Sequence, residues 1–107
     1  MNKKITRILA KKNKSKIVSL TAYSKNIAKI LDNFCDIVLV GDSMANVLYG
    51  FKNTGKINLQ NIIQHTLSVK KGIKKSLLVV DMPKDSYNNP KKAEKNARLL
   101  MHKTKCD

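Results

Sequence analysis

The chain has 107 residues, enough for one small domain, and 42% of them are hydrophobic, which excludes a wholly disordered protein. Its formal net charge of +15 raises the question of nucleic-acid binding. However, only Arg7 and Arg98 are Arg, the other basic residues are scattered Lys, and aromatic residues make up 5% of the chain. Abundant Lys and Asn are typical of an AT-rich coding sequence, so we interpret the charge as that of a solvated basic surface. We expect no nucleic-acid partner.

Nothing in the sequence predicts export or membrane insertion. The basic amino-terminal segment has an apolar stretch that Arg7 interrupts and Lys11 ends, which is too short for a signal peptide. No stretch approaches the roughly 20 apolar residues that span a bilayer. Cys35 and Cys106 have no metal-ligand spacing. We therefore expect a cytoplasmic protein with reduced thiols and no membrane partner.

The first third of the chain predicts a helix, a strand and a second helix. Apolar residues at positions 5, 8 and 9 share one helical face, and a polar link follows over 11–16. The apolar run over 17–22 predicts a strand. Ser24 is placed to cap the next helix, which ends at Asp32 and Asn33. The apolar face of that helix contains Ile27, Ala28 and Leu31.

The rest of the chain repeats the strand–helix pattern twice. The unbroken apolar runs 37–40 and 76–80 predict strands of a parallel sheet, and we expect the first of them to be buried on both faces. After a Gly-, Asn- and Lys-rich loop, Asn58 caps a helix that stops at Gly72. Asn89 caps the last helix, with Pro90 in its first position. The apolar faces contain Leu59, Ile62, Ile63, Thr66 and Leu67 in one helix and Ala93, Ala97, Leu100 and Met101 in the other.

This order, one helix and then strand–helix three times, predicts an α/β fold with right-handed βαβ units. Three strands cannot close a barrel, and they leave two unpaired edges. The chain ends where a fourth strand is expected to begin. We therefore expect one incomplete domain over residues 1–107.

Two carboxylates follow the second and third predicted strands directly. Asp42 and Asp81 stand at the carboxyl ends of these strands, where α/β folds place their active sites. Neighbouring strands lie about 4.8 Å apart, so the two side chains could share one cation. Oxygen ligands of this kind suit Mg²⁺. From spacing alone, the alternative that each Asp caps a turn or a helix stays open.

Two other features of the sequence resemble parts of functional sites. The segment 50–56 matches a phosphate-binding loop except at its last position, where Ile57 replaces the Ser or Thr that would hold Mg²⁺, and no clear strand leads into it. We expect no nucleotide there. His65 and His102 are lone helical histidines without evident partners, and a packed or surface role is expected for both.

Several segments, in order and spacing, resemble the ketopantoate hydroxymethyltransferase family. The resemblance runs from about residue 16 to residue 100. It is specific because several separate segments match along the chain. These segments are Lys16-Ile-Val-Ser-Leu-Thr-Ala-Tyr23, Val38-Leu-Val-Gly-Asp-Ser43, Gln64-His-Thr66 and Leu78-Val-Val-Asp-Met-Pro83, followed by Ser86-Tyr87.

The resemblance implies a fold and an activity. The fold would be a (β/α)₈ TIM-type barrel, of which this chain would supply the amino-terminal helix that covers the barrel bottom and the first three βα units. The enzyme of this family uses Mg²⁺ to bind 3-methyl-2-oxobutanoate. The keto acid is enolised and attacks the one-carbon unit of 5,10-methylenetetrahydrofolate, a step of pantothenate synthesis. The full-length enzymes of the family are homo-oligomers.

By resemblance, Asp42 and Asp81 would hold Mg²⁺ and contact the substrate. Ser43 would bind the carboxylate of the keto acid through its backbone N–H and hydroxyl groups. A further metal-binding Glu, a substrate-binding Lys and the Glu that acts as general base lie beyond residue 107 in the order of the family. The only Glu here is Glu94, which matches none of them. We therefore expect no catalytic base in this chain and no activity of the chain alone.

The chain departs from the family at two places near these residues. The usual Gly-Asp-Ser-Leu-Gly ends here in Ala45, and the usual Phe-Gly after Asp-Met-Pro is replaced by Lys84 and Asp85. The first change adds a methyl group where glycine allows a close backbone approach. Two other functions stay open: a decayed gene product without activity, and a Lys-rich module that binds polyanions.

Overall fold

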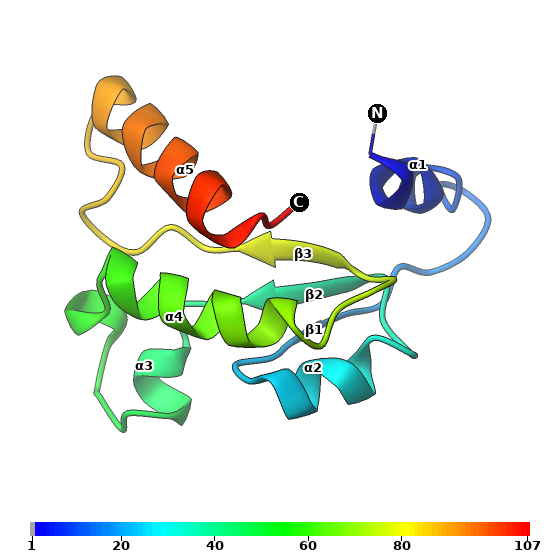
Figure 1. Ribbon diagram of the computed structural model, residues 1–107, viewed down its shortest axis with the longest axis horizontal. Coiled ribbons are helices and arrows are strands. Elements are labelled where there is room, and N and C mark those ends of the chain that lie inside the picture. The colour runs from blue at the N-terminus through cyan, green and yellow to red at the C-terminus, as the bar shows by residue number, and fades with distance from the viewer. Residues whose placement is uncertain (1) are drawn as a thin grey trace.

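The computed structural model describes residues 2–107 and contains one parallel sheet with the strand order β1-β2-β3 (Figure 1). Its strands are β1 (Ser19–Thr21), β2 (Ile37–Val40) and β3 (Leu77–Val80). Val38 pairs with Leu20 on one side and with Leu78 on the other. The predicted parallel sheet is confirmed, although the first strand is shorter than the run 17–22 that the sequence suggested.

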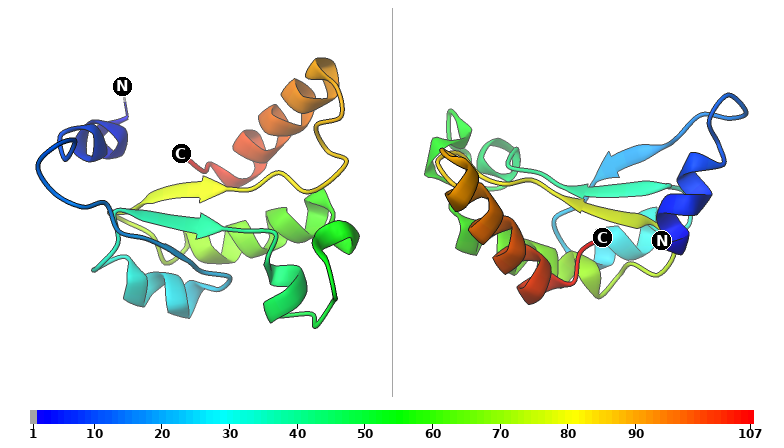
Figure 2. Two further views of the ribbon diagram at one scale, coloured as in Figure 1. Left: turned by 180° about the vertical axis from the view of Figure 1, so that it is seen from behind. Right: turned by 90° about the horizontal axis from the view of Figure 1, so that it is seen from above.

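The helices follow the predicted order, with additions in one loop. Figures 1 and 2 show that the helices α2, α4 and α5 lie on one side of the sheet, while α1 lies beside the amino ends of the strands. Two short elements, α3 and η1, occupy the segment predicted as a loop. The bounds are α1 (Lys3–Leu9), α2 (Lys25–Leu31), α3 (Met44–Val47), the 3₁₀ helix η1 (Thr54–Lys56), α4 (Leu59–Lys70) and α5 (Pro90–Thr104).

Asparagine side chains start the two longest helices. Asn58 accepts a hydrogen bond from the backbone N–H of Asn61, and Asn61 returns one to Asn58, which completes a capping box on α4. Asn89 caps α5 through the N–H of Lys92 at 2.8 Å. The prediction for Ser24 was wrong in its chemistry, because its side chain makes no capping bond. Instead, the Ser68 hydroxyl accepts a hydrogen bond from the backbone N–H of Lys25, the first residue of that helix.

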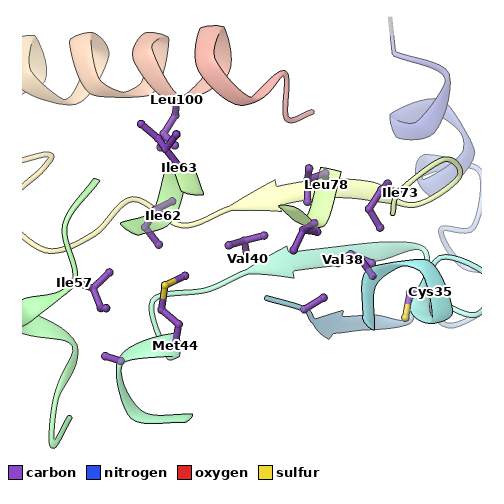
Figure 3. Close-up of a cluster of buried hydrophobic side chains, with 14 residues drawn as sticks. Cys35, Val38, Val40, Met44, Ile57, Ile62, Ile63, Ile73, Leu78 and Leu100 are labelled. Carbon is purple, nitrogen blue, oxygen red and sulfur yellow. The ribbon is translucent and has the colours of Figure 1, made fainter. Parts of the chain in front are cut away.

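The core lies between the sheet and these helices (Figure 3). Val38, Val40 and Leu78 point toward the helices and are fully buried. The largest buried side chains opposite them come from α3 and α4, among them Met44 and Ile62. One predicted member of the α4 face was wrong: Leu67 is exposed, because the helix turns it away from the sheet.

The opposite face of the sheet is covered less completely. Ile37, Leu39 and Leu77 are only partly buried, and Val79 is 38% exposed. Within residues 2–107 the second strand is therefore buried on one face only, and not on both as its apolar run suggested, because the helices that cover the sheet in Figure 2 lie on the other side. These four residues are called the open face below.

A carboxylate fixes the start of β3. Asp32, at the end of α2, accepts hydrogen bonds from the backbone N–H groups of Lys74, Lys75 and Ser76 at 2.8–3.2 Å. Burial alone would raise the pKa of Asp32, but these backbone N–H groups lower it below the ordinary value for Asp. The carboxylate thus binds the segment before β3 to the end of α2 and helps to set the register of β3 against β2.

Gly72 brings the same two regions into close contact. A Cβ atom at this position would lie 2.5 Å from the carbonyl oxygen of Lys25 and 2.8 Å from the backbone nitrogen of Lys29. The chain after α4 therefore passes directly against the backbone of α2, which only glycine permits. The sequence assigned Gly72 to the end of the helix, but its close packing against α2 was not evident there.

Polar contacts rather than a buried face hold α1. None of its residues is buried. Just after the helix, Lys11 pairs with Asp36 at 2.6 Å. Before and within it, Asn2 and Lys4 both contact the carboxylate of Asp107, at 2.6 and 3.3 Å. Among residues 2–107, no helix has the length and apolar character needed to cross a membrane.

Candidate metal and substrate site

The segments that follow β2 and β3 meet at one edge of the sheet. Val40 and Val80 are the last paired residues of these strands, and the N–H of Asp81 still donates to the carbonyl of Val40 at 3.0 Å. The N–H of Asp42 donates to Oδ2 of Asp81 at 3.1 Å. The prediction that Asp42 and Asp81 come together at the same end of a parallel sheet is therefore confirmed.

Gly41 makes this approach possible. A Cβ atom on Gly41 would lie 3.3 Å from Oδ2 of Asp81 and 3.5 Å from Oγ of Ser43. The first distance is shorter than an ordinary van der Waals contact, so a side chain at Gly41 would push the Asp81 carboxylate aside. The absence of a side chain lets the carboxylate reach across to the backbone of the neighbouring segment.

The hydrogen bonds decide against the capping alternative for the two aspartates. Within residues 2–107, the Asp42 carboxylate makes no hydrogen bond, and α3 begins after Ser43 without a side-chain cap. Asp81 bonds across to Asp42 through Oδ2, which leaves Oδ1 without a hydrogen bond in the described chain. Both residues are partly buried. Three of the four carboxylate oxygens thus accept no hydrogen bond within residues 2–107.

The oxygen donors are of the type that Mg²⁺ binds. Mg²⁺ commonly takes one or two carboxylates and completes its octahedron with water and substrate oxygens. The chain supplies two carboxylates here, and residues 2–107 contain no group of three or more His, Cys, Asp and Glu side chains able to hold a metal. The donor set fits a Mg²⁺ ion that keeps most of its positions for water, for a ligand or for donors outside this stretch.

A tyrosine that was not predicted from the sequence joins the site. The hydroxyl of Tyr23 lies 2.5 Å from Oγ of Ser43, and either oxygen can be the donor. In the parallel register Thr21 pairs with Leu39, so Tyr23 and Gly41, each two residues further on, lie at the same level. Asp81 lies at this level too, because Val40 pairs with Val80. This register was the signal that could have identified Tyr23, since all three positions project from the same edge.

His65 also has partners, contrary to the expectation from sequence. Its Nδ1 lies 2.9 Å from the carbonyl oxygen of Tyr23, and its Nε2 lies 2.6 Å from the hydroxyl of Tyr49. The Tyr49 ring stacks on Phe51 with centroids 5.7 Å apart. His102, in contrast, is exposed on α5, as expected.

The two departures from the family pattern lie in different surroundings. Ala45 is fully buried in the core, so its methyl group is accommodated by packing beneath the site. Lys84 and Asp85 are both exposed, and Asp85 has a positive φ of 68°. Asp and Asn adopt this left-handed conformation more readily than most residues, so the chain turns here without glycine.

Comparison with known proteins gives the family. The sequence model described as ketopantoate hydroxymethyltransferase matches residues 2–107. The chain belongs to this family. The name of the family is that of a transferase.

Curated relatives agree with this membership. A 3-methyl-2-oxobutanoate hydroxymethyltransferase from Pelagibacter ubique is 59% identical over 107 residues, which is 100% of this chain and 42% of the relative. Proteins of the same name from Anaplasma marginale and Bartonella tribocorum are each 46% identical, over 96% and 99% of this chain and 37% and 40% of their own lengths. The chain thus spans about two fifths of the length of these relatives.

The segment that resembles a phosphate-binding loop has a different structure. Its residues 50–56 follow α3 rather than a strand, and they end in the short η1 turn before α4. A phosphate-binding loop of that class connects a strand directly to a helix. The expectation against nucleotide binding at 50–56 thus agrees with the fold of the segment.

Proposed function

We propose that the protein containing this chain is a 3-methyl-2-oxobutanoate hydroxymethyltransferase of pantothenate biosynthesis. The reaction would transfer a hydroxymethyl group from 5,10-methylenetetrahydrofolate to the keto acid and yield 2-dehydropantoate. Family membership supports the class of reaction. The observation that carries the assignment to particular residues is the hydrogen bond from the Asp42 N–H to Asp81, which brings two carboxylates and Ser43 to one edge.

Asp42 and Asp81 are the residues proposed to hold Mg²⁺. The Asp42 carboxylate and Oδ1 of Asp81 are available for this, because neither accepts a hydrogen bond within residues 2–107. When bound, Mg²⁺ would supply a Lewis acid for the keto oxygen of the substrate and favour loss of a proton from the neighbouring carbon. The bond from Asp42 to Oδ2 holds the Asp81 carboxylate in one orientation, so little reorganisation is required on binding.

Ser43 is proposed to bind the carboxylate of the keto acid. An anionic carboxylate needs donors, and Ser43 offers its backbone N–H and its hydroxyl. The Tyr23 hydroxyl, 2.5 Å from Oγ of Ser43, can donate to that oxygen and leave the serine proton free to point at the substrate. The two donors of one residue would then fix which end of the keto acid faces the metal ligands.

Proton removal requires a base that residues 2–107 do not place at this edge. Glu94, the only Glu of the chain, is on α5 and pairs with Arg98 at 2.9 Å on an exposed surface. We propose that the base, a further metal ligand and a substrate-binding Lys come from the part of the family's length that this chain does not span. The 107-residue chain alone is then inactive, and the active form is a cytoplasmic homo-oligomer.

The test is an assay of 2-dehydropantoate formation from 3-methyl-2-oxobutanoate and methylenetetrahydrofolate with Mg²⁺. The full-length protein should turn over, and Asp42→Ala should lower kcat/KM by roughly 10²–10³-fold, the order seen when a group that stabilises transition-state charge is removed. The exposed Asp85→Asn is the matched control and should retain activity. Full activity of Asp42→Ala would contradict the assignment of the site.

A second arm tests whether the catalytic base and the remaining ligands come from outside residues 1–107. Residues 1–107 alone should show no turnover, while the same residues joined to the remaining length of the Pelagibacter ubique relative should regain it. Turnover by residues 1–107 alone that disappears in Asp42→Ala would contradict the proposed missing base. Lack of turnover in a folded full-length protein would favour the decayed gene product instead.

A further inference from the structure

We propose that His65 is a positioning residue that orients Ser43 through Tyr23. This inference rests on the proposed function, since it assumes that Ser43 binds the carboxylate of the keto acid. Two hydrogen bonds connect the three residues: one joins Nδ1 of His65 to the carbonyl of Tyr23, and the other joins the hydroxyl of Tyr23 to Ser43. The side chain of His65 itself makes no hydrogen bond to Ser43 or to either aspartate.

The chemistry of the partners fixes the tautomer of His65. The carbonyl oxygen of Tyr23 can only accept, so Nδ1 of His65 must carry the proton in the 2.9 Å bond. In the neutral ring Nε2 is then an acceptor, and the hydroxyl of Tyr49, 2.6 Å away, must be the donor. For the neutral ring the direction of both bonds is therefore determined, and the ring is held at its two nitrogens.

The helix that carries His65 is well placed to transmit this order. α4 begins with a capping box and buries Ile62 and Thr66 on either side of His65 in sequence. The same helix packs against β2 and β3, whose ends carry Asp42 and Asp81. By binding the carbonyl of Tyr23, His65 connects the end of β1 to α4, the helix that packs against β2 and β3. The segments that carry the site residues are then all connected to one rigid element, α4. These residues are Tyr23, Asp42, Ser43 and Asp81.

At the other end of this connection, the hydroxyl of Ser43 has a single polar side-chain partner within residues 2–107. A serine hydroxyl rotates freely unless a partner selects one orientation. Tyr23 is that partner, at 2.5 Å. If the backbone of Tyr23 shifts, its ring moves with it, and the hydroxyl of Ser43 loses the acceptor or donor that orients it. The expected loss is in substrate binding rather than in the chemical step.

Two substitutions of His65 separate its two hydrogen bonds. The amide nitrogen of Asn occupies the position of Nδ1, so His65→Asn keeps the donor to Tyr23 and loses the contact with Tyr49. The amide of Gln reaches the position of Nε2, so His65→Gln keeps the contact with Tyr49 and loses the donor to Tyr23. The exposed His102→Gln is the matched control.

The measurements are the Kd of 3-methyl-2-oxobutanoate by calorimetry with Mg²⁺ present, kcat and KM for the keto acid, and the melting temperature, all on the full-length protein. We expect His65→Gln to raise Kd and KM about fivefold, the effect of one lost hydrogen bond, with kcat changed less than twofold. His65→Asn and His102→Gln should stay within about twofold of the unsubstituted protein. Tyr23→Phe should reproduce the effect of His65→Gln.

The outcomes distinguish this inference from the proposed function. Equal Kd and KM values for His65→Gln and the unsubstituted protein would overturn the role of His65 and leave the proposed function intact. The same holds if His65→Asn and His65→Gln are impaired equally with a lowered melting temperature, which indicates a structural role. No binding of the keto acid by the unsubstituted protein would overturn the proposed function and the inference together.

Discussion

The backbone N–H of Asp42 donates a hydrogen bond to Oδ2 of Asp81 at 3.1 Å, across the ends of two neighbouring parallel strands. This bond selects one orientation of the Asp81 carboxylate without using its second oxygen. A carboxylate held in this way is ready to bind a cation with little further ordering. The register of β3 against β2, which Asp32 helps to set, thus determines how Asp42 and Asp81 lie relative to each other in the candidate site.

Gly41→Ala tests the space around this carboxylate. The added methyl group would lie 3.3 Å from Oδ2 of Asp81, so the carboxylate must move and its bond to Asp42 should weaken. We expect the Mg²⁺ affinity to fall about tenfold, as when a group that orients a metal ligand is lost. Calorimetric titration with Mg²⁺ measures it. Gly55→Ala, where the methyl group meets only the Asn53 side chain, is the control and should bind normally.

Gly72→Ala tests the close contact between α2 and the end of α4. The methyl group would lie 2.5 Å from the carbonyl oxygen of Lys25, which belongs to the backbone and cannot rotate away. We expect a loss of about 3 kcal/mol in the free energy of unfolding, the upper part of the range for overpacked cores. Urea denaturation of the full-length protein gives the value. A loss below about 0.5 kcal/mol would show that α2 shifts freely.

Asp32→Asn tests the carboxylate that receives three backbone N–H groups. The folded-state pKa of Asp32 lies below its ordinary value, so its contribution to stability is present above the unfolded pKa and disappears as the pH falls through the folded pKa. At pH 7 we expect the substitution to lower the free energy of unfolding by about 2 kcal/mol.

The pH dependence supplies the check on this assignment. The difference between Asp32→Asn and the unsubstituted protein should shrink below about pH 4, where the carboxyl group of Asp32 is protonated in the unfolded chain and then in the folded one. Asp85→Asn, on an exposed turn, is the control and should leave the free energy of unfolding at pH 7 unchanged. A pH-independent difference for Asp32→Asn would mean that charge has no part in its effect.

The open face predicts poor stability of residues 1–107 when they are expressed alone. Val79 is 38% exposed, and Ile37, Leu39 and Leu77 are only partly buried. A large apolar side chain that stays exposed forgoes about 1.5–3 kcal/mol, and several of them together approach the net stability of a domain. Circular dichroism should show a broad thermal transition. A sharp cooperative melt of the purified monomer would contradict this prediction.

The sequence predicted the sheet because apolar runs and helix caps occur in strict alternation. Asn58, Asn89 and Pro90 stand where the structure places the helix starts. Asp42 and Asp81 were found for the same reason, since each follows an apolar run and parallel strands end at one edge. Patterns local in sequence were therefore sufficient for the three strands, for α1, α2, α4 and α5, and for the two carboxylates, but not for the short elements α3 and η1.

What the sequence did not predict depends on contacts between distant residues. His65 meets the carbonyl of Tyr23 across 42 positions, and no spacing rule predicts a bond to a backbone atom so far away. The three N–H groups that Asp32 accepts lie 42–44 residues further on. The exposure of Leu67 likewise depends on how α4 rotates against the sheet, which its own periodicity leaves undetermined.

The polar attachment of α1 has a consequence for the order of events during synthesis. Among the helices of residues 2–107, α1 leaves the ribosome before the others, yet Asn2 and Lys4 contact Asp107, more than a hundred residues later. It also buries no residue of its own, so little holds it in place until that carboxylate is available. A contact of such sequence separation forms late, because closing a long loop is slow. Although α1 is made before the other described helices, it is thus expected to be among the last of them to dock.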